Sequence, residues 1–169
     1  MEQKYISIFL KTKKEINNEF WLKWYQDTKK IVELVGYKIT HLGIDSENFD
    51  SGKIRTFIKN ENKIINEIKN ENKINSISVI SLPEDYKTAA FDYDITIGMD
   101  KINIIASMKK EIFLNNEVNE KKLIDYISKY GEKGTGEIFE MGGEEFPLGY
   151  AAGFNEESFY KTLKIIKKI

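Results

Sequence analysis

The most regular alternation of apolar and polar positions runs through residues 91–97. Apolar side chains occupy every second position there, and Asp92 and Asp94 stand between them. A period of two is typical of a strand with one face toward the core and the other toward solvent. Residues 98–101 then predict a turn, and residues 102–108 alternate again, so this region is predicted to form a β-hairpin.

Other segments repeat apolar side chains at the spacing of an amphipathic helix. Asparagines stand where helix caps are expected, and Gly36 supplies a stop signal. Around the last cap, Phe154 and Phe159 are spaced for a hydrophobic staple. The predicted helices are the segment between Asn17 or Asn18 and Gly36, residues 53–71, residues 120–130 after a cap at Asn119, and the residues that follow a cap at Asn155.

Five further segments are predicted to be strands, which gives the order β-α-β-α-β-β-β-α-β-β-α. Consecutive strands in the middle of the chain favour antiparallel pairing. We therefore predict one α+β domain spanning residues 1–169, with a mainly antiparallel sheet and helices packed on one face. The five additional strands are residues 5–10, 37–44, 77–82, 137–141 and 146–152.

Composition narrows the possible classes of function. The chain has 169 residues, 41% of them hydrophobic, which is enough for a self-sufficient core. It has no cysteine, and this excludes disulfides, thiolate metal sites and cysteine nucleophiles. No export signal and no apolar run long enough to cross a bilayer are evident. We expect a cytoplasmic protein without membrane association, either monomeric or dimeric.

Charge argues against recognition of nucleic acid. The 26 basic residues nearly balance 27 acidic ones, and Arg55 is the single arginine. Arginine is the preferred residue for contacts to phosphates and base edges. A lysine-rich stretch covers residues 51–75, but Glu61, Glu67 and Glu71 interrupt it. No direct binding of nucleic acid is therefore expected.

No motif for catalysis or for a cofactor is present, so neither enzymatic activity nor a cofactor is expected. The glycines of residues 134–136 precede a predicted strand, whereas a phosphate-binding loop opens a helix. His41 is the only histidine and cannot form a histidine-rich metal site. Asp92 and Asp94 share a predicted strand face and could bind a hard cation. A solvated polar face predicts the same alternation, so a metal-dependent enzyme remains an alternative.

Two features suggest a surface for a protein partner. Trp21 and Tyr25 lie one helical turn apart in a cluster too aromatic for one helix face to bury, and exposed aromatic residues dominate many protein interfaces. Acidic residues also recur in the predicted loops and on one sheet face, where they would steer a basic partner. They are Asp45, Glu47, Asp50, Glu84, Asp85, Asp92, Asp94, Glu137, Glu140, Glu144 and Glu145.

As an architecture, the whole chain resembles a bacterial immunity protein, and the nearest features are the strand at 91–97 and the acidic turn at 137–146. The resemblance implies stoichiometric inhibition of a cognate toxin, with a nuclease as the expected target. A phage-encoded anti-CRISPR protein that inhibits an RNA-guided effector is similar in the same respects. We predict partner binding by Asp92, Asp94, Glu137, Glu140, Glu144, Glu145, Trp21 and Tyr25.

Overall fold

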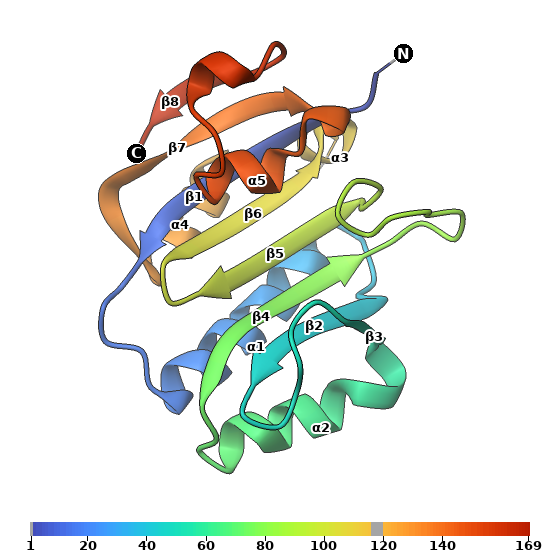
Figure 1. The fold of residues 1–169 in the computed structure, drawn as a ribbon, viewed down its shortest axis with the longest axis vertical. Helices are drawn as coiled ribbons and strands as arrows, with labels where there is room; N and C mark the ends of the chain where they lie inside the picture. Colours follow the sequence, from blue (N-terminus) through green and yellow to red (C-terminus); the bar gives the residue numbers. More distant parts are fainter. Residues whose placement is uncertain (1, 116–119) are drawn as a thin grey trace.

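The computed structural model describes residues 2–115 and 120–169. Within these residues, eight strands form one antiparallel sheet in the order β3-β2-β4-β5-β6-β1-β7-β8 (Figure 1). This confirms the predicted α+β class. The strands are β1 (Lys4–Thr12), β2 (His41–Ser46), β3 (Ile54–Thr56), β4 (Ile74–Ser81), β5 (Ile95–Asp100), β6 (Asn103–Lys109), β7 (Gly131–Gly142) and β8 (Lys164–Lys168).

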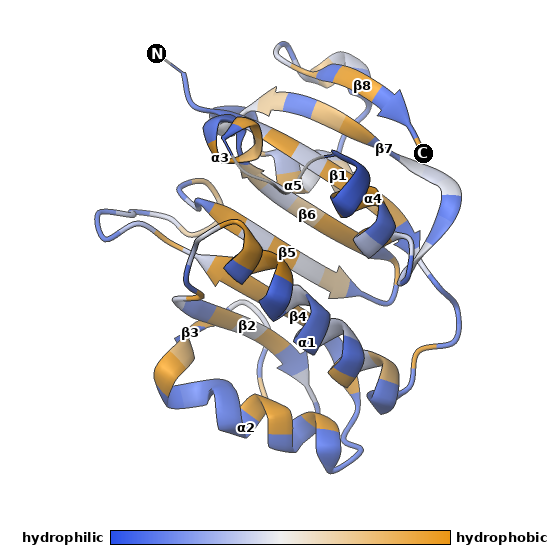
Figure 2. Ribbon diagram, turned by 180° about the vertical axis from the view of Figure 1, so that it is seen from behind, coloured by the Kyte–Doolittle hydropathy of each residue, from blue (hydrophilic) through white to orange (hydrophobic). Residues whose placement is uncertain are grey.

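The longer helices and the C-terminal segment lie on opposite faces of this sheet. Seen from behind, α1 and α4 cross the back face, and α2 extends beyond β2 at one edge (Figure 2). A short helix, α5, lies on the front face over β6 (Figure 1), so the prediction that all helices share one face is wrong for α5. The helices are α1 (Asn18–Leu34), α2 (Phe57–Lys69), α3 (Lys110–Leu114), α4 (Glu120–Ile127) and α5 (Pro147–Ala151).

The back face carries the main core, as the alternation of apolar residues requires. Ile6, Ile8 and Leu10 of β1 and Ile95 and Ile97 of β5 are all buried in it. Burying side chains of this size stabilises the fold by roughly 1.5–3 kcal/mol each relative to exposure. The hydrophobic periodicity therefore fixes which side of each strand the helices cover.

The predicted start and stop of α1 are confirmed. The Asn17 side chain accepts a hydrogen bond from the Phe20 N–H at 2.8 Å, which satisfies a donor in the first helical turn. Gly36 follows the helix with φ +78°, a conformation that glycine adopts without steric cost. The predicted cap of α4, Asn119, lies outside the described residues.

The predicted hairpin is also confirmed, with its strands shifted along the chain. β5 and β6 pair from Ile95 opposite Met108 to Met99 opposite Ile104. The first strand begins at Ile95, because residues 91–94 form a turn whose Asp92 and Asp94 N–H groups bond to the carbonyls of Thr88 and Ser81.

The C-terminal predictions are wrong. Residues 146–152, predicted as a strand, form α5, which starts at Pro147 after Phe146 adopts φ +63°. Residues after Asn155, predicted as a helix, form a loop, a 3₁₀ turn (Glu157–Phe159) and β8. The free edge of β7 offers backbone partners to the isoleucine-rich end of the chain, and such tertiary pairing overrides a local helical pattern.

Candidate functional site

Trp21 and Tyr25, predicted to be partly exposed, are buried. They are 2% and 1% exposed. Trp21 packs edge-to-face on Trp24 with ring centroids 5.9 Å apart, and the Tyr25 hydroxyl donates to Glu61 of α2 at 3.0 Å. α1 packs against both the sheet and α2, so the side chains of Trp21 and Tyr25 are covered and belong to the core.

Asp92 and Asp94 do not form the predicted pair on a strand face. An Asp92 oxygen accepts from the backbone N–H groups of Lys87 and Thr88 at 2.8 and 2.7 Å, and these hydrogen bonds hold its pKa below the ordinary range. Asp94 forms an ion pair with Lys109 at 2.7 Å. Both carboxylates therefore stabilise the turn before β5. In the described part of the chain, no three His, Cys, Asp or Glu side chains gather into a metal site.

Glu140 and Glu145 also make internal contacts. Glu140 is buried and pairs with Lys4 at 3.2 Å and Lys110 at 2.7 Å; its pKa is lowered, first by the hydrogen bond from Lys110. Glu145 accepts from the backbone N–H groups of Lys161 and Thr162, each at 2.7 Å. Desolvation would raise the pKa of Glu145, but these hydrogen bonds and one from the Thr162 hydroxyl outweigh it and lower the pKa. Glu145 thus joins the turn that follows β7 to residues 161–162, just before β8.

Glu137 is the most buried of the predicted acidic residues, at 3% exposure. The Tyr150 hydroxyl of α5 donates to one oxygen of its carboxylate, and Lys168 of β8 donates to the other at 2.5 Å. The carboxylate raises the pKa of Lys168 through this hydrogen bond. Desolvation, and then the hydrogen bond to Glu137, raise the pKa of Tyr150. Glu137 therefore joins β7, α5 and β8.

The predicted acidic surface is not one patch. Glu144 is exposed, but Asp45, Glu47 and Asp50 lie in and after β2, near the opposite edge of the sheet from β7. Five of the predicted acidic residues are already bound internally, which their spacing in the sequence does not reveal. They are Asp92, Asp94, Glu137, Glu140 and Glu145.

A different exposed surface appears where the loop between β4 and β5 meets the C-terminal segment. Phe91 contacts Phe146, and Phe146 contacts Phe154, with ring centroids 5.2 and 6.1 Å apart. Phe91, Phe154 and Phe159 are 40%, 68% and 66% exposed. Phe159 lies further along the C-terminal segment, against Tyr160. The name acidic aromatic face is used for the exposed acidic and phenylalanine residues of these two adjoining segments: Glu84, Asp85, Phe91, Glu144, Phe154, Glu156, Glu157 and Phe159.

The two segments that carry this face are strongly acidic. Residues 83–94 and 143–163 contain eight acidic side chains and two lysines, a formal charge of −6 in a chain whose total is −1. The rest of the chain therefore carries +5. This separation was readable from the sequence as clustered charge, but the exposed phenylalanines were not, because the helical pattern assigned Phe154 and Phe159 to a buried staple.

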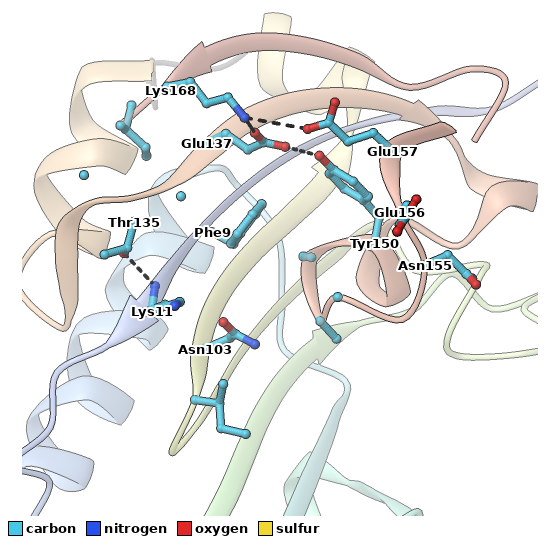
Figure 3. Close-up of a pocket in the computed structure, with 17 residues that line it drawn as sticks. Phe9, Lys11, Asn103, Thr135, Glu137, Tyr150, Asn155, Glu156, Glu157 and Lys168 are labelled. Atoms are coloured by element: carbon cyan, nitrogen blue, oxygen red, sulfur yellow. Dashed lines mark hydrogen bonds and ion pairs between the residues drawn. The ribbon is translucent and has the colours of Figure 1, made fainter. Parts of the chain in front are cut away.

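A cleft of about 850 Å³ opens on the front face beside this surface. We call it the C-terminal cleft. It lies between the ends of β1 and β6, the turn in β7 around Gly134, and the segment from Tyr150 to Glu157 (Figure 3). Gly136 has room for no side chain, because a Cβ there would lie 1.8 Å from the Phe9 carbonyl oxygen. That close approach brings β7 against β1. The charged residues that line the cleft are Lys11, Glu137, Glu156, Glu157 and Lys168.

His41 begins β2 and is half-buried. Burial lowers its pKa, and its ring lies edge-to-face with that of Tyr86, with ring centroids 5.6 Å apart.

None of the helices in the described residues combines the length and apolar character of a membrane span. No family model matches this chain, and no curated protein or solved structure matches it either.

Proposed function

We propose that this protein is a stoichiometric inhibitor that binds another protein through the acidic aromatic face, in the manner of an immunity protein that neutralises a toxin enzyme. The observation that carries the proposal is the exposure of Phe91, Phe154 and Phe159 within segments of formal charge −6. Large exposed apolar side chains cost solubility, and a cluster of them rimmed by charge marks interaction sites.

The charge of the face defines the partner. The five exposed carboxylates of this face attract a positively charged surface, speed encounter with it and disfavour acidic competitors. Enzymes that act on nucleic acids present such basic surfaces, because they must bind phosphates. Carboxylates of the inhibitor would then occupy positions that phosphates take in the substrate complex. A toxin nuclease fits this description, and an RNA-guided effector would be recognised by the same chemistry.

The test is a capture experiment from the native host, in which three forms of the protein are compared. The face variant carries Glu144→Lys and Glu156→Lys, and the control carries Glu33→Lys on the exposed side of α1. We expect a basic protein to be retained by the wild type and the control and lost by the face variant, and its enzymatic activity to fall as wild-type protein is added to one equivalent.

Equal retention of every captured protein by the face variant would contradict the proposal. So would a partner whose activity is unchanged at a full equivalent of bound wild-type protein. The identity of the captured enzyme distinguishes a toxin from an RNA-guided effector.

A further inference from the structure

The carboxylate of Glu137 lies at the wall of the C-terminal cleft and already binds a cation from its own chain. The side chain of Glu137 is 4% exposed, while that of Lys168, which contacts it at 2.5 Å, is 69% exposed. Lys168 also reaches Glu157 at 3.8 Å. Figure 3 shows the Lys168 ammonium joined by dashed lines to both carboxylates. The cleft therefore contains a site for a positive charge, which the exposed side chain of Lys168 fills in this structure.

Lys168 is the exposed member of this ion pair. An exposed lysine gives up side-chain entropy when one rotamer is fixed, and this cost partly offsets its hydrogen bond to Glu137. The Glu137 carboxylate, by contrast, is buried and held in place by the Tyr150 hydroxyl. An external cation that replaced Lys168 would meet a prepositioned acceptor, while the displaced ammonium would return to water.

The walls of the cleft favour a planar cation. Phe9 and Tyr150 both line it, with ring planes at 89° and centroids 6.4 Å apart. A guanidinium stacks on aromatic rings and offers two parallel N–H groups to a carboxylate, which a lysine ammonium does not. The volume of about 850 Å³ is within the range of ligand-binding clefts and leaves room for the backbone beside such a side chain.

We propose that the C-terminal cleft binds a guanidinium group, supplied by an arginine side chain of the partner, which displaces Lys168 from Glu137. That the arginine belongs to a partner protein rests on the proposed function, since the cleft adjoins the acidic aromatic face through Glu156 and Glu157. The cleft thereby adds a specific anchor to a surface that otherwise attracts by charge.

The test uses N-acetyl-L-arginine amide as the probe, with the uncharged N-acetyl-L-citrulline amide beside it. Binding is followed by NMR at the amides of Gly136 and Ile169, which bond to each other's carbonyls next to the cleft. Lys168→Ala removes an internal competitor whose effective concentration is on the order of millimolar. We expect this variant to bind the arginine probe roughly 10-fold more tightly than the wild type, and the citrulline probe to cause no shift.

Lys11→Ala is the matched control, because Lys11 lines the same cleft but forms no ion pair with Glu137. It removes one positive charge and should leave the affinity nearly unchanged. Glu137→Gln in the Lys168→Ala background should abolish binding, while its NMR spectrum confirms that the fold persists. Equal gains from Lys11→Ala and Lys168→Ala, or no probe binding by Lys168→Ala, would overturn the inference.

The outcome is separable from that of the proposed function. If the arginine probe does not bind to Lys168→Ala but the face variant loses its partner, the guanidinium site is wrong and the inhibitor proposal stands. If the probe binds and the face variant keeps every captured protein, the cleft does bind a guanidinium group. The assignment of that group to a partner protein is then wrong. Tighter binding of free L-arginine than of the amide would assign the cleft to a free amino acid and contradict a partner side chain.

Discussion

The two faces of the sheet are held by different balances of interactions, because the front face combines a smaller apolar cluster around Phe139 and Tyr150 with polar contacts. On the back face, β1 and β6 present Ile8, Ile104 and Met108 to the helices, and the packing there is apolar. On the front face, the same two strands present Ser7 and Ser107, whose hydroxyls lie 2.6 Å apart and continue to the Tyr93 hydroxyl at 2.8 Å. Residues 143–168 cover part of the front face, and we call them the C-terminal cover. The carboxylates of Glu137 and Glu145 hold this segment in place through hydrogen bonds.

This difference separates stability from recognition. Apolar burial is strong and insensitive to pH, which suits the back face to maintaining the fold. Hydrogen bonds to carboxylates are directional and depend on ionisation, so they can position a cover whose outer side stays exposed. The exposed phenylalanines and the C-terminal cleft both belong to this cover.

The largest effect is expected from truncation on the back face. Trp24 is fully buried, so Trp24→Ala should lower the free energy of unfolding by about 3–5 kcal/mol in urea titrations. Phe159→Ala on the front cover should change it by less than about 0.5 kcal/mol. Trp24→Phe is the informative intermediate, since the indole N–H has no hydrogen-bond partner among the described residues. A Phe159 variant as unstable as Trp24→Ala would break the comparison.

A smaller, local effect is expected at Glu145. Glu145→Gln weakens the hydrogen bonds to the N–H groups of Lys161 and Thr162, and should lower the free energy of local opening there by about 1–2 kcal/mol. Hydrogen exchange at those two amides measures it. Glu144→Gln, at the exposed neighbour, is the control and should leave their protection unchanged.

The same carboxylate makes the cover sensitive to acid. The folded-state pKa of Glu145 is lowered, so its contribution is complete above the unfolded value of about 4.3 and is lost as pH falls through the lower folded value. Protection of the Lys161 and Thr162 amides, corrected for intrinsic exchange, should therefore fall below about pH 4. In Glu145→Gln it should be flat across this range, and a parallel fall in the variant would contradict the assignment.

The smallest effect concerns the uncovered part of the front face. At Gly98, in the middle of β5, a Cβ would meet its nearest atom at 3.7 Å, an ordinary contact. Gly98→Ala should therefore raise the free energy of unfolding by about 0.4–1 kcal/mol, because alanine restricts the unfolded chain. Gly43→Ala is the matched control on the neighbouring part of the sheet. Its Cβ would lie 3.2 Å from the Ser78 hydroxyl, so the gain should be absent there in thermal melts.

The predictions from sequence succeeded where the determining contacts are local. The cap at Asn17, the stop at Gly36 and the hairpin of β5 and β6 depend on residues a few positions apart. The α+β class followed from the order of such segments. The site residues were harder, because a carboxylate in a loop has the same local pattern whether it faces solvent, like Glu144, or a backbone N–H, like Glu145.

The sequence by itself determined the alternation of apolar and polar residues that separates the two faces of the sheet. It also determined the formal charge of −6 that residues 83–94 and 143–163 carry together. Tertiary structure alone decided that Trp21 is covered, that the chain ends as β8 along β7, and that Glu137 meets Tyr150 and Lys168. The physical reason is the separation along the chain of the residues that interact. Periodicity reports on side chains within one element, whereas burial and ion pairing depend on residues that are distant in the chain and meet only when the sheet has formed.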